Sequence, residues 1–325
     1  MRLGGNARFM AEINTPDEVA TLIQSAKRQN LEFFVLGGGS NTIARDEGYD
    51  GLILLMRING FEKLDEDASS MTLRIGAGEN WDSIVDKSVQ LNLSGIEAMS
   101  AIPGTAGAAP VQNVGAYGQE IADTLIELEA YDSQDEKFVT LLKEDCEFSY
   151  RDSIFRGSQI GRYIITSITI NLSKSPLQPP FYEALQKYFD DANTTIFTPQ
   201  VIRDAVTAIR AEKLPDPKLK PNTGSFFKNA IIENWQLNEL KQTYPDVPNF
   251  DMADGNFKVP TGWLIDKAGL RGQLLHGMRI NPSNALVLIN ESASGYADLD
   301  RARQEIIGAV RDKFRIHIEQ EPLEI

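Results

Sequence analysis

The sequence predicts an α+β fold, and three features of the chain indicate it. Strand candidates dominate the first half, whose early part has one helix, so the regular helix–strand alternation of a doubly wound sheet is missing. The composition changes near residue 174, where a connector rich in Ser and Pro begins. The last third then carries a long amphipathic helix. We therefore expect two domains that meet near residues 174–200.

Four segments have helical spacing. The first follows Thr15, an N-cap candidate, with Pro16 at the first helical position and apolar residues repeating through Ala26. The others are Trp81–Leu91, a helix from Thr198-Pro199 that stops before Leu214-Pro215, and a helix with apolar residues from Leu299 to Phe314.

Strand candidates are short apolar runs, several of them alternating with a period of two. Phe33–Leu36 runs directly into a glycine cluster. The others are Leu52–Ile58, Met71–Ile75, Leu125–Tyr131, Tyr163–Leu172, Ala285–Ile289 and Arg315–Glu319.

Composition excludes several classes of protein. Among 325 residues, 32 Lys and Arg against 46 Asp and Glu leave a net charge of −14, which repels nucleic acid and anionic membranes. A single cysteine, Cys146, excludes an internal disulfide, and two histidines make a His-based metal centre improbable. No segment approaches the roughly 18 apolar residues of a membrane span. We expect a cytoplasmic protein without membrane insertion, and a monomer because no heptad seam is present.

Two glycine-rich stretches are candidates for binding a phosphate-bearing cofactor. Residues 37–41 read Gly-Gly-Gly-Ser-Asn, and glycines let backbone N–H groups approach phosphate closely. An ordinary glycine turn explains this stretch equally well. Residues 102–118 carry almost only small side chains and no charge, which suits a backbone wrapped around a large flat ligand, although a long surface loop is the alternative.

Polar candidates lie further along the chain. Arg151 stands between Tyr150 and Asp152 and could clamp a carboxylate, or form a surface ion pair. Ser225 lies between Gly224 and two aromatic residues and could be a proton donor or a nucleophile, or a half-buried strand residue. The carboxylates of residues 319–324 would by themselves be a solvated tail. Five basic residues lie close together in the sequence and suit the binding of an anionic substrate, although a solvated basic face is the alternative. They are Arg210, Lys213, Lys218, Lys220 and Lys228.

The order of these motifs closely resembles the UDP-N-acetylenolpyruvoylglucosamine reductase family over essentially the whole chain. The motifs are Gly-Gly-Gly-Ser-Asn (37–41), Gly-Ala-Gly-Glu-Asn-Trp (76–81), Ile-Pro-Gly (102–104), Gln-Asn-Val-Gly-Ala-Tyr-Gly (112–118), Tyr-Arg-Asp-Ser-Ile-Phe (150–155), Lys-Leu-Pro-Asp-Pro-Lys (213–218), Gly-Ser-Phe-Phe-Lys-Asn (224–229) and Gly-Trp-Leu-Ile-Asp (262–266).

The resemblance implies a domain organisation. A two-lobed FAD-binding domain of the vanillyl-alcohol-oxidase type would span 1–174, with lobes of about 1–58 and 59–174. A connector at 175–200 would carry Tyr182, as in the longer subtype of the family, and 201–325 would form an α+β substrate-binding domain.

The resemblance also implies the chemistry and its residues. In the family, NADPH reduces FAD, and a hydride then passes to C3 of the enolpyruvyl group of UDP-N-acetylglucosamine-enolpyruvate. Arg151 would hold the substrate carboxylate, and Ser225 would protonate C2. The family's Leu-Glu-Pro-Glu-Val ending appears as Ile318–Pro322, which assigns the catalytic glutamate to Glu321, with Glu319 and Glu324 as weaker alternatives. For that role the tail must fold inward and burial must raise the pKa of Glu321.

Binding residues follow in the same way. The expected FAD contacts are Gly37, Gly38, Gly39, Ser40, Asn41, Ile102, Pro103, Gly104, Gly107, Ala108, Asn113, Gly115, Ala116, Tyr117 and Gly118. The expected contacts of the UDP-sugar are Tyr182, Arg210, Lys213 and Asn229, and no metal ligand is expected. Two alternatives remain: another flavin oxidase on the same scaffold, and an inactive relative that only binds UDP-sugars.

Overall fold

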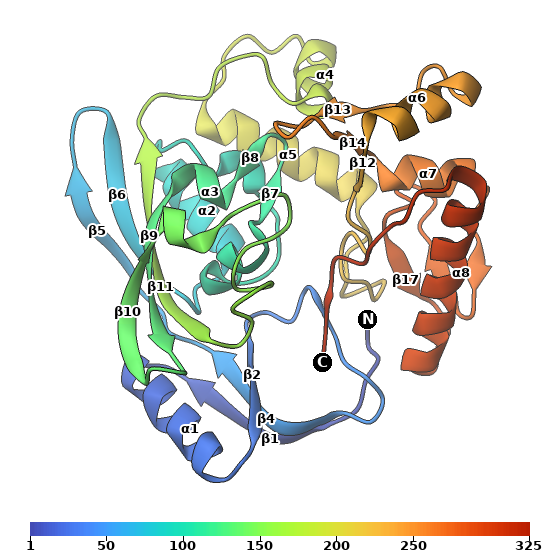
Figure 1. Ribbon diagram of the computed structural model, residues 1–325. Coiled ribbons are helices and arrows are strands. Elements are labelled where there is room, and N and C mark those ends of the chain that lie inside the picture. Colours follow the sequence, from blue (N-terminus) through green and yellow to red (C-terminus); the bar gives the residue numbers. More distant parts are fainter. The chain divides into compact units, whose positions relative to one another are not determined.

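The computed structural model describes residues 1–325, and their contacts divide the chain into two compact units (Figure 1). The first unit comprises residues 7–40 and 49–210, and the second comprises 1–6, 41–48 and 211–325. The two units do not coincide with the expected domains, because the connector 175–200 and residues 201–210 pack within the first unit. Residues 41–48, directly after the glycine cluster, pack within the second unit. The domain boundaries themselves stay predictions.

A parallel three-stranded sheet opens the first unit. Strands β1 (Ala7–Ile13) and β2 (Glu32–Leu36) lie on either side of β4 (Tyr49–Met56). Helix α1 (Pro16–Arg28) begins with the predicted N-cap, where Thr15 and Glu18 form a reciprocal capping box. Its Val19, Ile23 and Ala26 are buried, as their helical spacing predicts.

An antiparallel five-stranded sheet forms the larger part of the first unit, in the order β10-β9-β11-β6-β5. The predicted strands are confirmed as β6 (Ser70–Gly76), β9 (Leu125–Asp132) and β11 (Tyr163–Ser173). The edge strands β5 (Phe61–Glu66) and β10 (Lys137–Leu142) were not predicted, because most of their side chains are exposed and lack the apolar run of a buried strand. The helix predicted at Trp81–Leu91 is α2 (Trp81–Gln90), and a short helix α3 (Ile121–Thr124) precedes β9.

Two helices complete the first unit. Helix α4 (Glu183–Asp191) lies in the connector, where the sequence analysis assigned no helix, and α5 (Pro199–Lys213) begins where predicted. Their facing apolar side chains form a core separate from that of the sheets. This core joins Phe181, Leu185 and Phe189 to the buried face of α5. The short strands β7 (Gly115–Ala116) and β8 (Gln119–Glu120) pair with each other.

The second unit contains three small sheets and three helices. The first sheet holds β12 (Ala230–Ile232), β14 (Phe257–Val259) and β13 (Phe250–Asp251), and the second holds β15 (Leu274–Leu275), β16 (Met278–Ile280) and β17 (Leu288–Asn290). The third pairs β3 (Thr42–Ile43) with β18 (Leu323–Glu324) in parallel. The helices are α6 (Asn234–Thr243), α7 (Thr261–Lys267) and α8 (Tyr296–Phe314).

Two strand predictions in the second unit need correction. Arg315–Glu319 is not a strand: Arg315 ends α8 with a left-handed φ of 57°, and Ile316 and Ile318 are buried without regular ladder pairing. Burial of alternate residues gave this segment a strand-like pattern. The strand predicted at Ala285–Ile289 is shorter than expected, because Asn284 forms a turn with Leu286 and Val287 before β17 begins.

None of the helices combines the length and apolarity that a membrane span requires.

Candidate active site

The two glycine-rich stretches approach each other backbone to backbone within the first unit. A Cβ on Gly37 would lie 2.5 Å from Oγ1 of Thr105, and a Cβ on Gly38 would lie 3.1 Å from Cα of Gly104. Ser40 Oγ donates a hydrogen bond of 3.3 Å to the carbonyl of Pro103. The loop after residue 101 therefore lies against the glycine turn that follows β2, and at Gly37 and Gly38 the close approach leaves little room for a side chain.

The second glycine-rich loop is also fastened to the start of α2. The N–H of Trp81 donates to the carbonyl of Gly104 at 3.1 Å, and the N–H of Ala106 donates to the carbonyl of Glu79 at 2.9 Å. Gly107 packs so closely that an added Cβ would lie 2.5 Å from the Cβ of Ala77. The conformation of this loop is thus fixed by backbone bonds on both sides of Thr105.

Arg151 lies beside the later part of the same glycine-rich segment. Its Nη2 donates a hydrogen bond of 2.6 Å to the carbonyl of Gly115, and its Nη1 lies 3.4 Å from the carbonyl of Asn113. The Arg151 backbone is left-handed, with a φ of 56°, and the ring of Tyr150 lies 5.3 Å from its guanidinium carbon. The structure thus brings the predicted carboxylate-binding residue to the predicted cofactor loop.

Asn113, an expected FAD contact, has both the oxygen and the nitrogen of its side chain bonded within the protein. It is buried, its side-chain oxygen accepts the N–H of Ala122 at 3.2 Å, and its amide donates to the carbonyl of Ser149 at 3.1 Å. The side chain therefore joins three segments of the fold around Arg151.

Three predicted ligand contacts gather near α4 and α5. The rings of Tyr117 and Tyr182 meet edge to face at 5.9 Å. Burial raises the pKa of Tyr117, while the charge of Arg210 acts in the opposite direction. Burial also lowers the pKa of Arg210, whose buried Nε has no hydrogen-bond partner. A guanidinium placed in this way suits the anion-binding role predicted for Arg210.

Ser225 and Glu321 are brought to the same place in the second unit. Ser225 pairs with Val287 in an isolated β-bridge, and the N–H of the next residue, Phe226, donates to the carbonyl of Leu286 at 2.7 Å. On the other side, the N–H of Glu321 donates to the carbonyl of Phe226 at 2.8 Å. Residues 225–227 are therefore held between the 286–287 segment and the C-terminal tail.

The tail folds inward, as the sequence analysis required. None of residues 320–325 is exposed, whereas Glu319 is. The carbonyl of Asn41 accepts the N–H of Leu323 at 3.0 Å, and the Asn41 amide lies 3.5 Å from the carbonyl of Glu321. The last residue of the predicted phosphate loop is thus tied to the predicted catalytic segment.

Glu324 is fully engaged by cationic and hydroxyl groups. Its carboxylate accepts hydrogen bonds from Arg45 at 2.6 Å, from the Tyr296 hydroxyl at 2.6 Å and from Arg303 at 3.0 Å. Burial alone would raise the pKa of Glu324, but these bonds lower it to about 2. A carboxyl group held ionised in this way does not suit a role that needs a protonated acid, which leaves Glu321 as the better candidate.

The other two predicted substrate contacts also lie in the second unit. The carbonyl of Lys213, at the end of α5, accepts a bond of 3.4 Å from the Asn281 amide. The Asn229 side-chain oxygen accepts the N–H of Thr261 at 3.2 Å. Sequence reasoning missed Thr105 and the polar contacts around Asp82. The one signal for Asp82 is an acidic residue in the first turn of α2, whose N-cap is Asn80.

Comparison with known proteins identifies the class of protein and then the family. Residues 7–141 match the model of an FAD binding domain, so the chain is a flavoprotein. Residues 216–325 match the model of the UDP-N-acetylenolpyruvoylglucosamine reductase C-terminal domain. The chain belongs to the UDP-N-acetylenolpyruvoylglucosamine reductase family.

Individual relatives agree with this assignment. The UDP-N-acetylenolpyruvoylglucosamine reductase of Dechloromonas aromatica is 37% identical over 326 residues, which cover 99% of this chain and 95% of the relative. That of Neisseria gonorrhoeae is 36% identical over 322 residues, which cover 98% and 92%. The crystal structure of UDP-N-acetylenolpyruvylglucosamine reductase (MurB) from Thermus caldophilus shares the fold, with a TM-score of 0.62 at 22% identity, covering 97% of this chain and 91% of that one. The resemblance and the α+β fold class predicted from the sequence are confirmed.

The residues of the first unit fit FAD. The positions at Gly37 and Gly38 are ones that a Cβ would fill, so backbone N–H groups there can reach a diphosphate. The buried Oγ1 of Thr105, beside Gly37, has no hydrogen-bond partner within the protein. The contacts expected at residues 37–41 and 102–118 stay predictions at the level of single residues.

Proposed function

We propose that this chain catalyses the NADPH-dependent reduction of UDP-N-acetylglucosamine-enolpyruvate to UDP-N-acetylmuramate, a step of peptidoglycan precursor synthesis. In chemical terms it is an oxidoreductase that acts on a CH–CH group with NADP as acceptor. Family membership supports the substrate. The observation that carries the reaction is the hydrogen bond between Glu321 and Phe226, because it brings a hydroxyl donor and a carboxyl group to one segment.

Arg151 would bind the carboxylate of the enolpyruvyl group. FAD, when bound, supplies the transfer of a hydride from NADPH to the substrate. Negative charge then develops at C2 and on the adjoining carboxylate, and a guanidinium stabilises it most effectively when it is already oriented. The bonds of Arg151 to the carbonyls of Gly115 and Asn113 supply that orientation.

Ser225 would donate the proton that C2 requires. An alcohol is a weak acid, but an enolate-like carbon is basic enough to take its proton when the geometry is favourable. Glu321, in its protonated form, would hydrogen-bond the substrate carboxylate or polarise the double bond. With a hydride at C3 and a proton at C2, the product is charge-balanced.

The remaining residues would hold the nucleotide sugar. Arg210, whose buried Nε has no hydrogen-bond partner, would bind the diphosphate, and Tyr182, at the start of α4, would contact the same ligand. Lys213 and Asn229 would bind the same ligand. As the sequence predicts, we expect a cytoplasmic monomer with a small-molecule substrate.

The proposal is tested by the visible spectrum of the purified protein under anaerobic conditions. A yellow protein that bleaches with NADPH and regains its colour with UDP-N-acetylglucosamine-enolpyruvate would support the proposed reaction. Bleaching that this substrate does not reverse would favour another flavin enzyme. A protein that takes up no FAD would overturn the proposal and leave a binding protein for UDP-sugars.

A further inference from the structure

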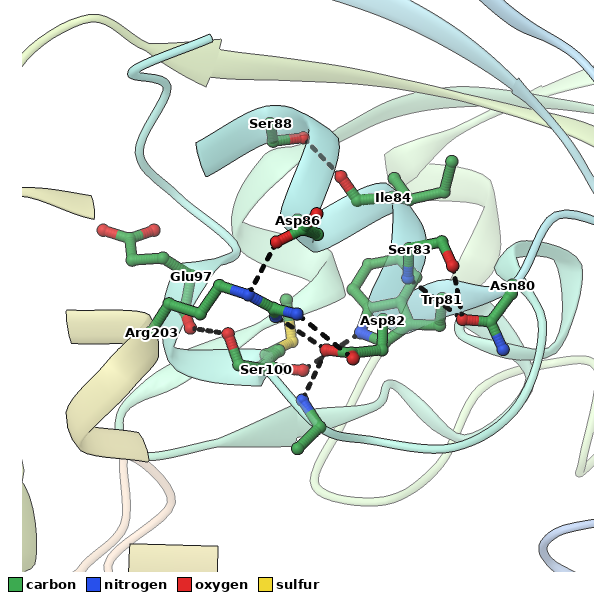
Figure 2. A network of polar contacts seen from close by, with 12 residues as sticks. Asn80, Trp81, Asp82, Ser83, Ile84, Asp86, Ser88, Glu97, Ser100 and Arg203 are labelled. Atoms are coloured by element: carbon green, nitrogen blue, oxygen red, sulfur yellow. Dashed lines mark hydrogen bonds and ion pairs between the residues drawn. The ribbon is translucent and has the colours of Figure 1, made fainter. Parts of the chain in front are cut away.

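Asp82, on the first turn of α2, joins two parts of the first unit that the proposed function uses separately. Its Oδ1 accepts hydrogen bonds from Nη1 of Arg203 at 2.7 Å and from the N–H of Ala101 at 2.6 Å, and its Oδ2 accepts Nη2 of Arg203 at 3.2 Å. Figure 2 shows the Arg203 guanidinium facing both Asp82 and Asp86 from across the gap between the helices. One carboxylate therefore binds a loop and a helix at once.

On the loop side, Asp82 stabilises an unfavourable backbone conformation. Ala101 has a φ of 57°, a left-handed backbone conformation that is unfavourable for a residue with a Cβ. It directly precedes Ile102, Pro103 and Gly104, the part of the loop that lies against Gly38. The N–H of Trp81 holds the carbonyl of Gly104, so the start of α2 holds this loop at both ends. Without the charge of the Asp82 carboxylate, the N–H of Ala101 is left with a weaker acceptor, and one of these two attachments of the loop is weakened.

On the helix side, Asp82 fixes the face of α5 that carries Arg210. Arg203 and Arg210 are seven residues apart, so they lie on one face of the helix, about 20° apart around its axis. The Arg203 side chain is only 14% exposed, and its Nε also pairs with Asp86 at 3.1 Å. Asp82 lies near enough to Arg210 for their charges to favour each other's ionised forms. The bonds between Asp82 and Arg203 therefore fix the helix face that carries Arg210, whereas Asp86 pairs with Arg203 and accepts a hydrogen bond from Gln90 at 2.7 Å.

We propose, on the basis of the proposed function, that Asp82 is a positioning residue that holds the FAD-binding loop and the nucleotide-binding arginine Arg210 in register with each other. Its loss weakens the binding of FAD and of the UDP-sugar together. Arg203 transmits only the second effect, because the bond between Asp82 and Ala101 does not involve it.

The test compares three variants: Asp82→Asn, Arg203→Gln and the matched control Asp86→Asn. FAD affinity is measured by titrating FAD into flavin-free protein, and substrate affinity by calorimetry with UDP-N-acetylglucosamine-enolpyruvate and no NADPH. Asp82→Asn should weaken both affinities about tenfold, as expected for a charged hydrogen bond. Arg203→Gln should weaken substrate binding by a similar factor and leave FAD binding within twofold. Asp86→Asn should leave both within twofold.

The outcomes separate this inference from the proposed function. If the wild-type protein binds neither FAD nor the substrate, the proposed function fails first. If the wild type binds both and Asp82→Asn changes neither, the inference alone is overturned. If Asp82→Asn does not fold, Arg203→Gln tests the inference by itself. Equal loss of FAD and substrate affinity in that variant, or loss of neither, would contradict the inference that Arg203 acts on substrate binding alone. A rise in KM with unchanged bleaching by NADPH would distinguish positioning of Arg210 from general structural damage.

Discussion

The backbone N–H of Glu321 donates a hydrogen bond of 2.8 Å to the carbonyl of Phe226, the residue that follows Ser225. Nearly a hundred residues of sequence separate Ser225 from Glu321, yet this bond fixes the two backbones side by side. The neighbouring residues continue the contact: Phe227 forms an isolated β-bridge with Gln320, and the N–H of Lys228 donates to the carbonyl of Glu319. The proposed proton donor and the proposed catalytic carboxyl group thus lie on paired segments of the second unit.

Replacing Ser225 by alanine should separate the two half-reactions. Bleaching by NADPH should stay within twofold of the wild type, because it needs no proton at C2. Recovery of colour on adding the substrate should slow at least about 100-fold, the usual minimum effect of removing a general acid. Rapid-mixing absorbance measures both steps. Ser292→Ala, an exposed serine of the same unit, should change neither; equal loss in both steps of Ser225→Ala would make that residue structural.

Glu321→Gln should likewise affect the substrate step and leave bleaching by NADPH intact. Glu319→Gln is the matched comparison, because its carboxylate is exposed and reaches only Lys228, at 3.9 Å. An ion pair this long, with its carboxylate in solvent, contributes at most about 1 kcal/mol. Single-turnover kinetics of flavin reoxidation by the substrate, measured for both variants, shows which glutamate the substrate step requires. The reverse pattern, with Glu319→Gln impaired and Glu321→Gln active, would show that the tail has been aligned with the family in the wrong register.

Local signals in the sequence account for the elements that were predicted. Thr15, Pro16 and Glu18 form a complete helix start within four residues, and the apolar pattern of Tyr163–Leu172 locates β11 to within one residue. Signals of this kind depend on residues that are neighbours in the chain. Exposed edge strands and the helix inside the connector give much weaker local patterns, and they were missed.

Contacts between distant segments could not be predicted in this way. The bond between Arg203 and Asp82 spans 121 positions, and that between Asn41 and Glu321 spans 280. Each of these residues has an ordinary local context, so only the folded chain reveals the pairing. The same reason explains the wrong strand at Arg315–Glu319, since its alternating burial comes from packing of Ile316 and Ile318 and not from a neighbouring strand.

The attachment of the tail through Glu324 should depend on pH. Its folded-state pKa of about 2 lies below the unfolded value of about 4.3, so its stabilising effect is complete above pH 5 and is lost as the pH falls towards 2. Glu324→Gln should lower the free energy of unfolding by about 2 kcal/mol at pH 7, where the charged hydrogen bonds are lost. Urea denaturation of both proteins between pH 7 and pH 2 measures the difference. It should shrink as the wild-type carboxylate is protonated, and a difference that is constant with pH would contradict this role of the charge.

Gly37→Ala should weaken FAD binding, and a second substitution should restore it. The new Cβ would lie 2.5 Å from Oγ1 of Thr105, closer than real contacts allow, so the two glycine-rich loops must separate or Thr105 must turn away. Because the backbone N–H groups of these loops are the proposed phosphate donors, we expect FAD affinity to fall about tenfold or more.

In the double variant Gly37→Ala/Thr105→Ala the clashing oxygen is gone, and the next contact of that Cβ, with the Cβ of Ala108 at 3.4 Å, can be accommodated. Its FAD affinity should return most of the way to that of Thr105→Ala alone. Gly308→Ala serves as the control for glycine replacement itself, since a Cβ there meets nothing closer than 3.9 Å and lies inside α8. That change should stabilise the protein by up to about 1 kcal/mol and leave FAD affinity unchanged. Titration of FAD into the flavin-free wild type and the four variants measures these affinities. If Gly37→Ala binds FAD as tightly as the wild type, the close approach of the two loops does not matter for the cofactor.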